Sequence, residues 1–416
     1  MAVGRITLAA NTTGTQNVAV GAFAADANTT GNNNAALGHQ ALGANSTGSA
    51  NTALGFQALN SNTTANNNTA VGGNALRVNT TGAQNTAVGV QAGENITTAT
   101  YNVVIGYLAL AACQTGVRNT AIGSFALEDT TASHCTAVGY GALAQNTSAA
   151  GNTAVGSGAL TLNTTGTHCT ALGFNALTAH TTGFENTAIG RQTLEDCTTG
   201  TRNTALGSIA LTTCTTGSFN TALGREALRD LTTGSFNTGL GRSAGEQMTT
   251  GQNNILIGND AGRGGTPGGT ITSESNRICL GNSQITNFSC QVSLTATSDA
   301  RDKTDITDFT PGLSWINKLR PVTYKWDQRS WYGTDEDPFG IPDGSKKASK
   351  INIGLLAQEE LEIEKEHGYG NDENDMLVAD ISADGNQYSM KYERLVPILI
   401  NAIKELSAKV TALEAA

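Results

Sequence analysis

NTAVGSGALTLNTTGTH (residues 152–168) is the stretch that decides the fold, because the chain repeats it many times. Its aliphatic-Gly pair recurs with the glycine at positions 4, 21, 38, 55, 72, 89, 106, 123, 139, 156, 173, 190, 207, 224, 241 and 258. Every interval is 17 residues except the one from 123 to 139, which is 16. So strict a period indicates one structural unit that is copied in space.

The composition of the repeat predicts short β-strands joined by turns, with one coil for each repeat. Helix is disfavoured because glycine falls about twice in each repeat and Asn and Thr fill the gaps. The glycines permit positive φ at corners or close backbone approach, and NTTG supplies turn residues. Such coils stack with a rise of about 4.8 Å, so fifteen steps give a rod on the order of 70 Å long.

Three positions of the repeat are expected to fill a narrow interior. Ala dominates three residues after the glycine, as at Ala41 and Ala58, and Leu dominates at the next position, as at Leu42. The residue before each glycine is always Val, Leu or Ile, from Val3 to Ile257, and we expect it to point inward too. Each coil holds only about two large aliphatic residues. Because this is a small apolar core for a rod made of a single chain, we infer that partner chains cover further surface of the rod.

Stacking places identical side chains above one another, so the repeat predicts asparagine ladders. The first Asn of NTAVG recurs at 17, 34, 51, 68, 85, 102, 119, 152, 186, 203, 220, 237 and 254, and Cys135 and Cys169 take the same position. Cys113, Cys197 and Cys214 take the position of the NTTG asparagine. We interpret these five cysteines as small buried substitutes in the ladders, since no CxxC pair occurs.

Charge and hydropathy exclude several classes of protein. Residues 1–297 hold ten Arg and no Lys against twelve acidic residues, a net charge of −2; residues 298–416 hold ten Lys and four Arg against twenty-two acidic residues, a net of −8. Neither part has the basic balance of a nucleic-acid-binding protein. No stretch approaches the roughly 20 apolar residues of a membrane span, and the N-terminus has no apolar run of signal-peptide length. We therefore expect neither nucleic-acid binding nor membrane insertion.

The repeat register ends at a glycine-rich stretch, and a different composition follows. We expect a β repeat shaft over 1–263, a Gly-rich linker and β stem over 264–297, and an α+β domain over 298–416. GRGGTPGGT (262–270) has GxGxxG-like spacings, but no amphipathic helix follows, so a nucleotide site is disfavoured. Residues 276–297 alternate apolar and polar side chains, which is typical of a strand.

Three stretches of the α+β domain predict regular structure. Residues 312–326 suggest a helix that stops near Pro321 and then a strand, and residues 351–367 suggest a strand that enters a helix. A helix over 393–415 closes the chain and carries a heptad seam, which favours a coiled coil. β-Branched and Leu residues alternate along the seam, which favours a coiled coil of two helices. So short a seam is nevertheless weak evidence for the number of helices. The seam consists of Val396, Leu399, Ile403, Leu406, Val410 and Leu413.

Four ordered motifs, SDARDKTDI, LRPVTYKW, IGLLAQE and YERLVPILINAIKEL, resemble the C-terminal intramolecular chaperone domain of phage endosialidase tail spikes. The same domain recurs in phage tail fibres, neck appendages and a membrane-bound myelin regulatory factor. The resemblance implies that the domain drives trimerisation of the preceding fibre and then cuts itself off. The serine and lysine that carry the cleavage in that family match Ser298 and Lys303, which places the cut at the Thr297–Ser298 bond. NTAVG is also similar to the head repeats of trimeric autotransporter adhesins and to repeats of phage and bacterial fibre proteins.

The chemistry of such a cut makes definite demands on the motif. A serine hydroxyl needs a base to take its proton, and lysines serve as bases only where burial or nearby positive charge lowers their pKa. The serine would attack the carbonyl of Thr297 in an N-to-O acyl shift, and hydrolysis of the ester would follow, once per chain. In a strand the two side chains would lie on opposite faces, so a turn or a neighbouring subunit must bring them together. Asp299 and Arg301 support the motif, whereas Asp302 departs from the apolar residue expected there.

Metal sites are disfavoured elsewhere in the chain. Acidic loops at 333–344 and 370–376 could hold calcium, but neither has the twelve-residue spacing that ends in Glu, so solvated loops are favoured. The His–Cys pairs at 134–135 and 168–169 are poor zinc candidates, because structural zinc needs four converging ligands. We expect no metal and no cofactor.

The sequence thus predicts a homotrimeric fibre, with a β-solenoid or β-roll-like shaft and a self-cleaving α+β chaperone domain that ends in a coiled-coil helix. Expected partners are the other two copies, a receptor on a host or target cell (glycans among the candidates), and a baseplate or particle anchor protein. The expected location is a virion tail fibre, an extracellular injection particle or a cell surface. The alternative is a surface fibre with a permanent, non-cleaving trimeric cap. An enzyme for external substrates is disfavoured, because the repeats hold no paired carboxylates or triad. The repeat phase starts at Val3–Gly4 with no anchoring domain ahead, which suggests a fragment of a longer fibre.

Overall fold

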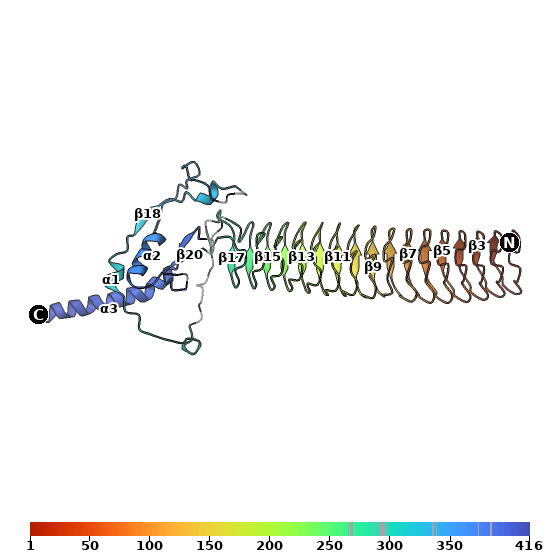
Figure 1. Ribbon diagram of the computed structural model, residues 1–416, viewed down its shortest axis with the longest axis horizontal. Coiled ribbons are helices and arrows are strands. Elements are labelled where there is room, and N and C mark those ends of the chain that lie inside the picture. The colour runs from red at the N-terminus through yellow and green to blue at the C-terminus, as the bar shows by residue number, and fades with distance from the viewer. Residues whose placement is uncertain are drawn as a thin grey trace. The chain divides into compact units, whose positions relative to one another are not determined.

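The structure, a computed structural model, describes residues 1–264, 266, 269–285, 287–289, 291, 296, 298–334, 337, 339–372, 374–382 and 385–416. The chain divides into two compact units, residues 1–259 with 272–278 and residues 260–271 with 279–416. The first unit is a stack of coils and the second combines helices with two small sheets (Figure 1). Among the described residues, no helix has the length and apolar character that crossing a bilayer requires.

Each repeat forms one coil that adds one short strand to a parallel sheet (Figure 1). The strands pair one repeat apart, so that Thr204 is opposite Thr221 and Leu206 is opposite Leu223. The predicted β-solenoid is therefore confirmed. Its strands are β1 (Ala2–Val3), β2 (Val18–Val20), β3 (Ala35–Leu37), β4 (Thr52–Leu54), β5 (Thr69–Val71), β6 (Thr86–Val88), β7 (Val103–Ile105), β8 (Thr120–Ile122), β9 (Thr136–Val138), β10 (Thr153–Val155), β11 (Thr170–Leu172), β12 (Thr187–Ile189), β13 (Thr204–Leu206), β14 (Thr221–Leu223), β15 (Thr238–Leu240), β16 (Ile255–Ile257) and β17 (Ile278–Leu280).

The coils continue past the last seventeen-residue interval. The backbone N–H of Thr249 donates to Thr272 O at 2.7 Å, and that of Ile255 donates to Arg277 O at 2.8 Å. These pairs are 23 and 22 residues apart, whereas the matching pairs one coil earlier, Thr232 with Thr249 and Thr238 with Asn254, are 17 and 16 apart. An insertion of six residues therefore hides this coil from a search at a fixed period, and β17 belongs to the sheet rather than to a separate stem.

The coil interior differs from the prediction at one position. The expected Ala and Leu after the glycine are fully buried, as at Ala210 and Leu211. The prediction that the aliphatic residue before the glycine points inward is wrong, because Leu206 is 43 % exposed and Leu54 is 41 % exposed. Side chains alternate along a strand, and the inward position goes to the small residue between, such as Ala205. The coil is so narrow that the Leu on its other side already fills the interior.

The interior leucines and the residues two positions before them have a left-handed backbone, which the sequence did not predict. Ile209 has a φ of 58° and Leu211 a φ of 51°, a conformation that costs about 1–2 kcal/mol for a non-glycine residue. It turns alternate N–H groups towards opposite neighbours: Ile209 N donates to Arg191 O in the preceding coil at 2.9 Å, and Leu211 N to Ala227 O in the following coil at 3.0 Å. Hydrogen bonds between coils and full burial of the leucine offset the strain.

The invariant glycine is required by close backbone approach. Gly207 has a φ of +137°, and a Cβ atom at this position would lie 2.4 Å from Gly224 O in the next coil. A residue with a Cβ atom would be strained at this φ and would also clash with the next coil. The glycine therefore serves both expected purposes, a positive φ and a close backbone approach.

Two buried asparagine ladders connect the coils, as the repeat predicts. In the first ladder, Asn203 Oδ1 accepts from Asn220 N at 3.0 Å, and Asn203 Nδ2 donates to Gly217 O at 2.8 Å. In the second, Asn62 Nδ2 donates to Asn45 Oδ1 at 2.8 Å. The bonds of the first ladder satisfy backbone groups that would otherwise be buried without partners, and the bond of the second joins two side chains.

The cysteines in these ladders are buried, as expected, and burial raises the pKa of each thiol. Cys135 and Cys169 point inward, whereas His134 and His168 are exposed, so each His–Cys pair faces in two directions. His180 occupies a position of the second ladder and is fully buried. Burial lowers the pKa of His180 to about 4, which keeps the ring neutral near pH 7.

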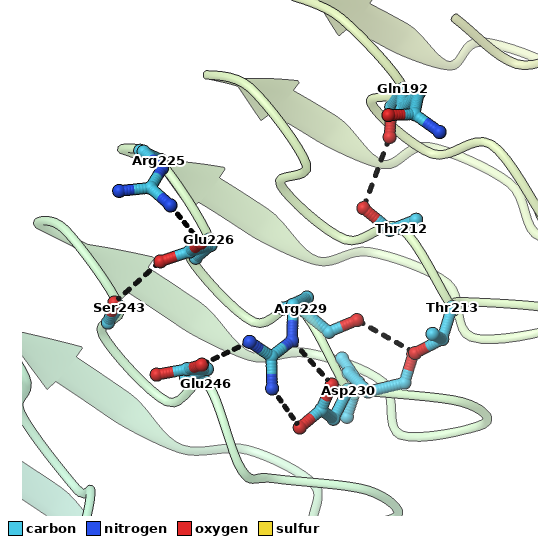
Figure 2. A network of polar contacts seen from close by, with 10 residues as sticks. Gln192, Thr212, Thr213, Arg225, Glu226, Arg229, Asp230, Ser243 and Glu246 are labelled. Carbon is cyan, nitrogen blue, oxygen red and sulfur yellow. Dashed lines mark hydrogen bonds and ion pairs between the residues drawn. The ribbon is translucent and has the colours of Figure 1, made fainter. Parts of the chain in front are cut away.

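Charged side chains also pair between coils near the end of the stack (Figure 2). Arg229 donates to Asp230 through Nε at 2.7 Å and Nη2 at 2.8 Å, and to Glu246 in the next coil through Nη1. The hydrogen bond with Asp230 is the largest cause of a raised pKa of Arg229. Thr213 Oγ1 donates to Arg229 O at 2.7 Å, so the network spans three coils.

The second unit is α+β, as predicted, and its elements are short. The predicted terminal helix over 393–415 is present, whereas the pair β20–β21 was not predicted. The elements are η1 (Ala300–Asp302), α1 (Leu313–Ile316), β18 (Val322–Tyr324), η2 (Arg329–Trp331), β19 (Asn352–Gly354), α2 (Ala357–Glu366), β20 (Ala379–Ile381), β21 (Tyr388–Met390), η3 (Tyr392–Arg394) and α3 (Leu395–Glu414), with β18 antiparallel to β19 and β20 antiparallel to β21.

The core of this unit is built around one tryptophan and two buried carboxylates. Trp315 Nε1 donates to Glu360 Oε1 at 2.8 Å, and burial raises the pKa of Glu360. The carboxylate of Glu364, fully buried, accepts three backbone N–H groups at 2.6–2.8 Å, from residues 377, 378 and 379, and so fixes the start of β20 on α2. The apolar residues of the core are Trp315, Ile363, Val378, Leu395 and Ile398.

Candidate functional site

The candidate nucleophile and its base lie at the two ends of a short turn. η1 separates Ser298 from Lys303, and Lys303 N donates to Ala300 O at 3.3 Å to close the turn. Lys303 Nζ lies 2.6 Å from Ser298 Oγ, within hydrogen-bond distance. Sequence alone left open whether a turn or a neighbouring chain joins the two side chains, and in this structure the turn joins them within one chain.

Asp299 and Arg301 hold this turn rather than the reacting groups. The Asp299 carboxylate caps η1 by accepting from Arg301 N at 2.9 Å, and it pairs with Arg301 Nη2 at 2.6 Å. These bonds lower the pKa of Asp299. Asp302, where an apolar residue was expected, is exposed, and its N–H donates to Asp299 O at 3.2 Å. An acidic residue is therefore compatible with the turn in the single chain.

The pair has the contact that its chemistry needs, but it is not buried. Both Ser298 and Lys303 are exposed to solvent. A lysine must be neutral to accept a proton, and desolvation is the usual way to favour that form. Thr297, on the other side of the expected cut, lies outside the described residues. The site of cleavage therefore stays a prediction.

The terminal helix presents the predicted heptad seam to solvent. One face of α3 packs on the core through Leu395, Ile398 and Ala402, and Asn401 Nδ2 donates to Phe309 O at 2.6 Å. An apolar seam is stabilised only when another helix covers it, so α3 has the surface of an unassembled coiled-coil strand. The exposed fractions are 52 % for Val396, 43 % for Leu399, 65 % for Ile403, 53 % for Leu406, 45 % for Val410 and 78 % for Leu413.

An apolar groove of about 410 Å³ adjoins the start of this seam. Leu399 belongs to both the groove and the seam, and Ile353 on the groove wall is 78 % exposed. The groove thus extends the uncovered apolar surface from α3 onto β19. It is lined by Ile316, Leu319, Pro321, Ile353, Gly354, Leu355, Tyr392, Leu395 and Leu399.

Two aspartates of the acidic loops accept hydrogen bonds within local turns. In the loop 333–344, Asp337 Oδ1 accepts from Phe339 N at 3.1 Å. In the loop 370–376, Asp375 Oδ1 accepts from Asp372 N at 2.9 Å, and backbone hydrogen bonds are the main cause of a lowered pKa of Asp375. Within the described part of the chain, no three His, Cys, Asp or Glu side chains form a group that could hold a metal ion.

Sequence reasoning missed a second serine contact. Ser314 Oγ lies 3.1 Å from His367 Nε2, and His367 Nδ1 lies 2.8 Å from Ile363 O. The His367 ring stacks on Trp315 with centroids 4.7 Å apart. The two residues are 53 positions apart and carry no local motif, so only the packing of α1 on α2 could reveal the pair.

Comparison with known proteins finds one match. A family model described as chaperone of endosialidase matches residues 298–369, which begin at the candidate serine and include the lysine. No curated protein and no solved structure matches the chain. The match supports a C-terminal chaperone domain of the endosialidase type, in agreement with the resemblance seen in the sequence.

Proposed function

We propose that the protein is a homotrimeric fibre whose C-terminal domain, residues 298–416, drives trimerisation and then cuts itself off at Thr297–Ser298. The observation that carries the proposal is the 2.6 Å contact between Lys303 Nζ and Ser298 Oγ, at the start of the segment that matches the endosialidase chaperone family. The confirmed solenoid and the exposed seam of α3 support the fibre and its assembly.

The reaction uses only groups of the chain and one water molecule. Neutral Lys303 takes the proton of the Ser298 hydroxyl, and Oγ attacks the carbonyl carbon of Thr297. The C–N bond breaks, the Ser298 nitrogen gains a proton and becomes a free amine, and Thr297 is held as an ester on Oγ. Water then hydrolyses the ester, which leaves a carboxylate on Thr297 and regenerates the hydroxyl. Each chain reacts once.

Assembly would act as the switch for this reaction. Ser298 and Lys303 are exposed in the single chain, and a lysine base needs desolvation. Packing of neighbouring copies around η1 would supply that burial, so only assembled fibres would be cut. A chaperone of this kind also answers a folding problem, because long-range β pairing is slow and prone to error.

The proposed role of the fibre is attachment. One end would bind a baseplate or particle anchor protein, and the shaft would present its side chains to a receptor on a host or target cell, glycans included. The fibre would then belong to a virion tail, an extracellular injection particle or a cell surface.

Denaturing electrophoresis with intact-mass spectrometry tests the cleavage. Wild type should yield two pieces whose masses correspond to a cut after Thr297, whereas Ser298→Ala and Lys303→Ala should keep the full 42.7 kDa. Ser314→Ala is the matched control, because it removes another exposed serine that contacts a basic side chain. A full-length wild type would refute the cleavage, and loss of cleavage in Ser314→Ala would refute the assignment of the nucleophile.

A second candidate is a permanent cap that trimerises and never cuts. The solvent exposure of the Ser298–Lys303 pair favours this alternative, because no residue that the structure describes desolvates the base. Light scattering separates the outcomes: an uncut trimer means a permanent cap, and a monomer would refute both proposals.

A further inference from the structure

The outward side of the strands in the coil stack is uncharged from β1 to β17. Each strand of three residues turns its first and third side chains outward, and in β13 these are Thr204 and Leu206. We call the third-position residues the outer ladder. None of its members is charged, and the first positions are Ala, Val, Thr or Ile throughout. The outer ladder comprises Val20, Leu37, Leu54, Val71, Val88, Ile105, Ile122, Val138, Val155, Leu172, Ile189, Leu206, Leu223, Leu240, Ile257 and Leu280, with Val3 at the end of the two-residue strand β1.

Such a face is unusual for a surface in water. Parallel sheets in proteins are almost always covered on both faces, and contiguous apolar patches above a few hundred Å² mark sites of interaction. Seventeen strands about 4.8 Å apart and a face roughly 10 Å wide give roughly 800 Å² of uncharged surface, apolar along the outer ladder and mostly Thr at the first strand positions. This is the area that each partner buries in a stable protein interface.

We propose that the outer ladder is the surface through which three copies of the shaft pack, parallel and in register; the number three rests on the proposed homotrimer. A partner for this face must present an uncharged surface of the same length and the same spacing between rungs, and a second copy of this chain does so. Charged residues of the shaft lie at other positions of the coil, such as Arg202 and Glu185, which pair at 2.9 Å. Like copies can therefore meet along the outer ladder without burying a charge.

The helix α3 points independently to the same occupant. Its exposed seam, from Val396 to Leu413, is a second uncovered apolar surface in the same chain. The heptad spacing of that seam is met by a parallel copy of the same helix. Two surfaces of different geometry thus both require further copies of this chain, one in the shaft and one in the chaperone domain.

Packing along the outer ladder gives the shaft its own means of staying assembled. The shaft would remain trimeric after the chaperone domain has left, because its interface lies wholly before Ser298. Register would be marked by strands whose first residue is not Thr, such as β7, where Val103 lies between Thr86 and Thr120. A slip by one coil in either direction would place Val103 opposite Thr.

Site-specific crosslinking of the full chain tests the inference. Packed sheets lie about 10 Å apart, beyond the roughly 7 Å limit between Cα atoms for a disulfide, so a short bismaleimide is the probe. Leu206→Cys in a Cys290→Ser background should give a linked pair of chains on a denaturing gel. Thr216→Cys, an exposed position on a turn of the same stack, should remain unlinked. The native cysteines that the structure describes are buried and should not react.

Two further measurements make the result decisive. Differently tagged Leu54→Cys and Leu206→Cys chains, expressed together, should form links only between equal rungs, and a mixed link would overturn the register. Leu206→Glu should lower the midpoint of dissociation of the shaft trimer, whereas Thr216→Glu should leave it unchanged. A trimer by light scattering that gives no link at Leu206 and tolerates the Glu would overturn this interface and leave the proposed trimer intact. A monomer would overturn both.

Discussion

Removal of one rung of the first asparagine ladder should open the shaft locally. Asn203→Ala deletes the acceptor of Asn220 N, at 3.0 Å, and the donor to Gly217 O, at 2.8 Å. Both orphaned groups are buried, and a buried polar group that loses its partner costs about 1–3 kcal/mol. The substitution should therefore destabilise this part of the shaft by about 3 kcal/mol, which corresponds to an approximately hundredfold change in the local opening equilibrium.

Amide hydrogen exchange with peptide-level mass spectrometry measures this opening, since coils open locally as well as globally. Peptides that cover 203–237 should exchange about a hundredfold faster in Asn203→Ala, and peptides near the N-terminus should be unchanged. Asn203→Cys is the matched control, because Cys169 occupies the same ladder position and its thiol lies 3.8 Å from Gly183 O. We expect a clearly smaller effect for Cys. Equal exchange in Ala and wild type, or an equal loss with Cys and Ala, would refute the argument from orphaned hydrogen bonds.

Three other perturbations follow from the structure. His180 is buried with its pKa lowered to about 4, so its contribution to stability is complete above about pH 6.5 and is lost as pH falls towards 4; His180→Asn should remove this part of the pH dependence in thermal unfolding. Gly207→Ala should destabilise the shaft by at least about 3 kcal/mol in denaturant titration, whereas Gly141→Ala, with a φ of +63° and open space around the new Cβ, should cost about 1 kcal/mol. Burial raises the pKa of Glu360, so its contribution is present at low pH and is lost as pH rises through the folded-state pKa. Glu360→Gln should flatten this dependence, and the bond from Trp315, followed by fluorescence, should persist.

The repeat made most of the shaft predictable. Period, strands, buried Ala–Leu pairs and asparagine ladders all follow from the seventeen-residue pattern, because one residue type at one position has one environment in every coil. The orientation of the aliphatic residue before the glycine was mistaken, since invariance is equally typical of a core and of a contact surface. Left-handed leucines could not be foreseen, because no rule of local propensity favours them. The coil that contains β17 was not predicted, because six inserted residues break the seventeen-residue period.

In the second unit, the order of the four motifs predicted the domain type, whereas local hydropathy patterns predicted only some of the helices and strands. The helix η1, which lies between Ser298 and Lys303, is three residues long, and its capping by Asp299 could be read from the sequence only after the structure had shown η1. The buried carboxylates of Glu360 and Glu364 were not predicted, because on a helix rich in Glu nothing local separates the inward residues from the exposed ones. The contact of Ser314 with His367 depends on tertiary packing alone.

The backbone hydrogen bonds that leave a coil of the shaft reach a neighbouring coil, and this has a consequence for how the length of the shaft can change over generations. A duplication or loss of seventeen codons would add or remove one complete coil, with both cut ends rejoined in an unchanged environment. Each such event would alter the length of the coil stack by about 4.8 Å and leave the sequence of the second unit unchanged. The sixteen-residue interval between Gly123 and Gly139, and the longer insertion before β17, show that the stack also tolerates unequal copies. The gene can therefore change in length by whole repeats. Selection could then adjust the length of the coil stack without altering the residues of the Ser298–Lys303 site.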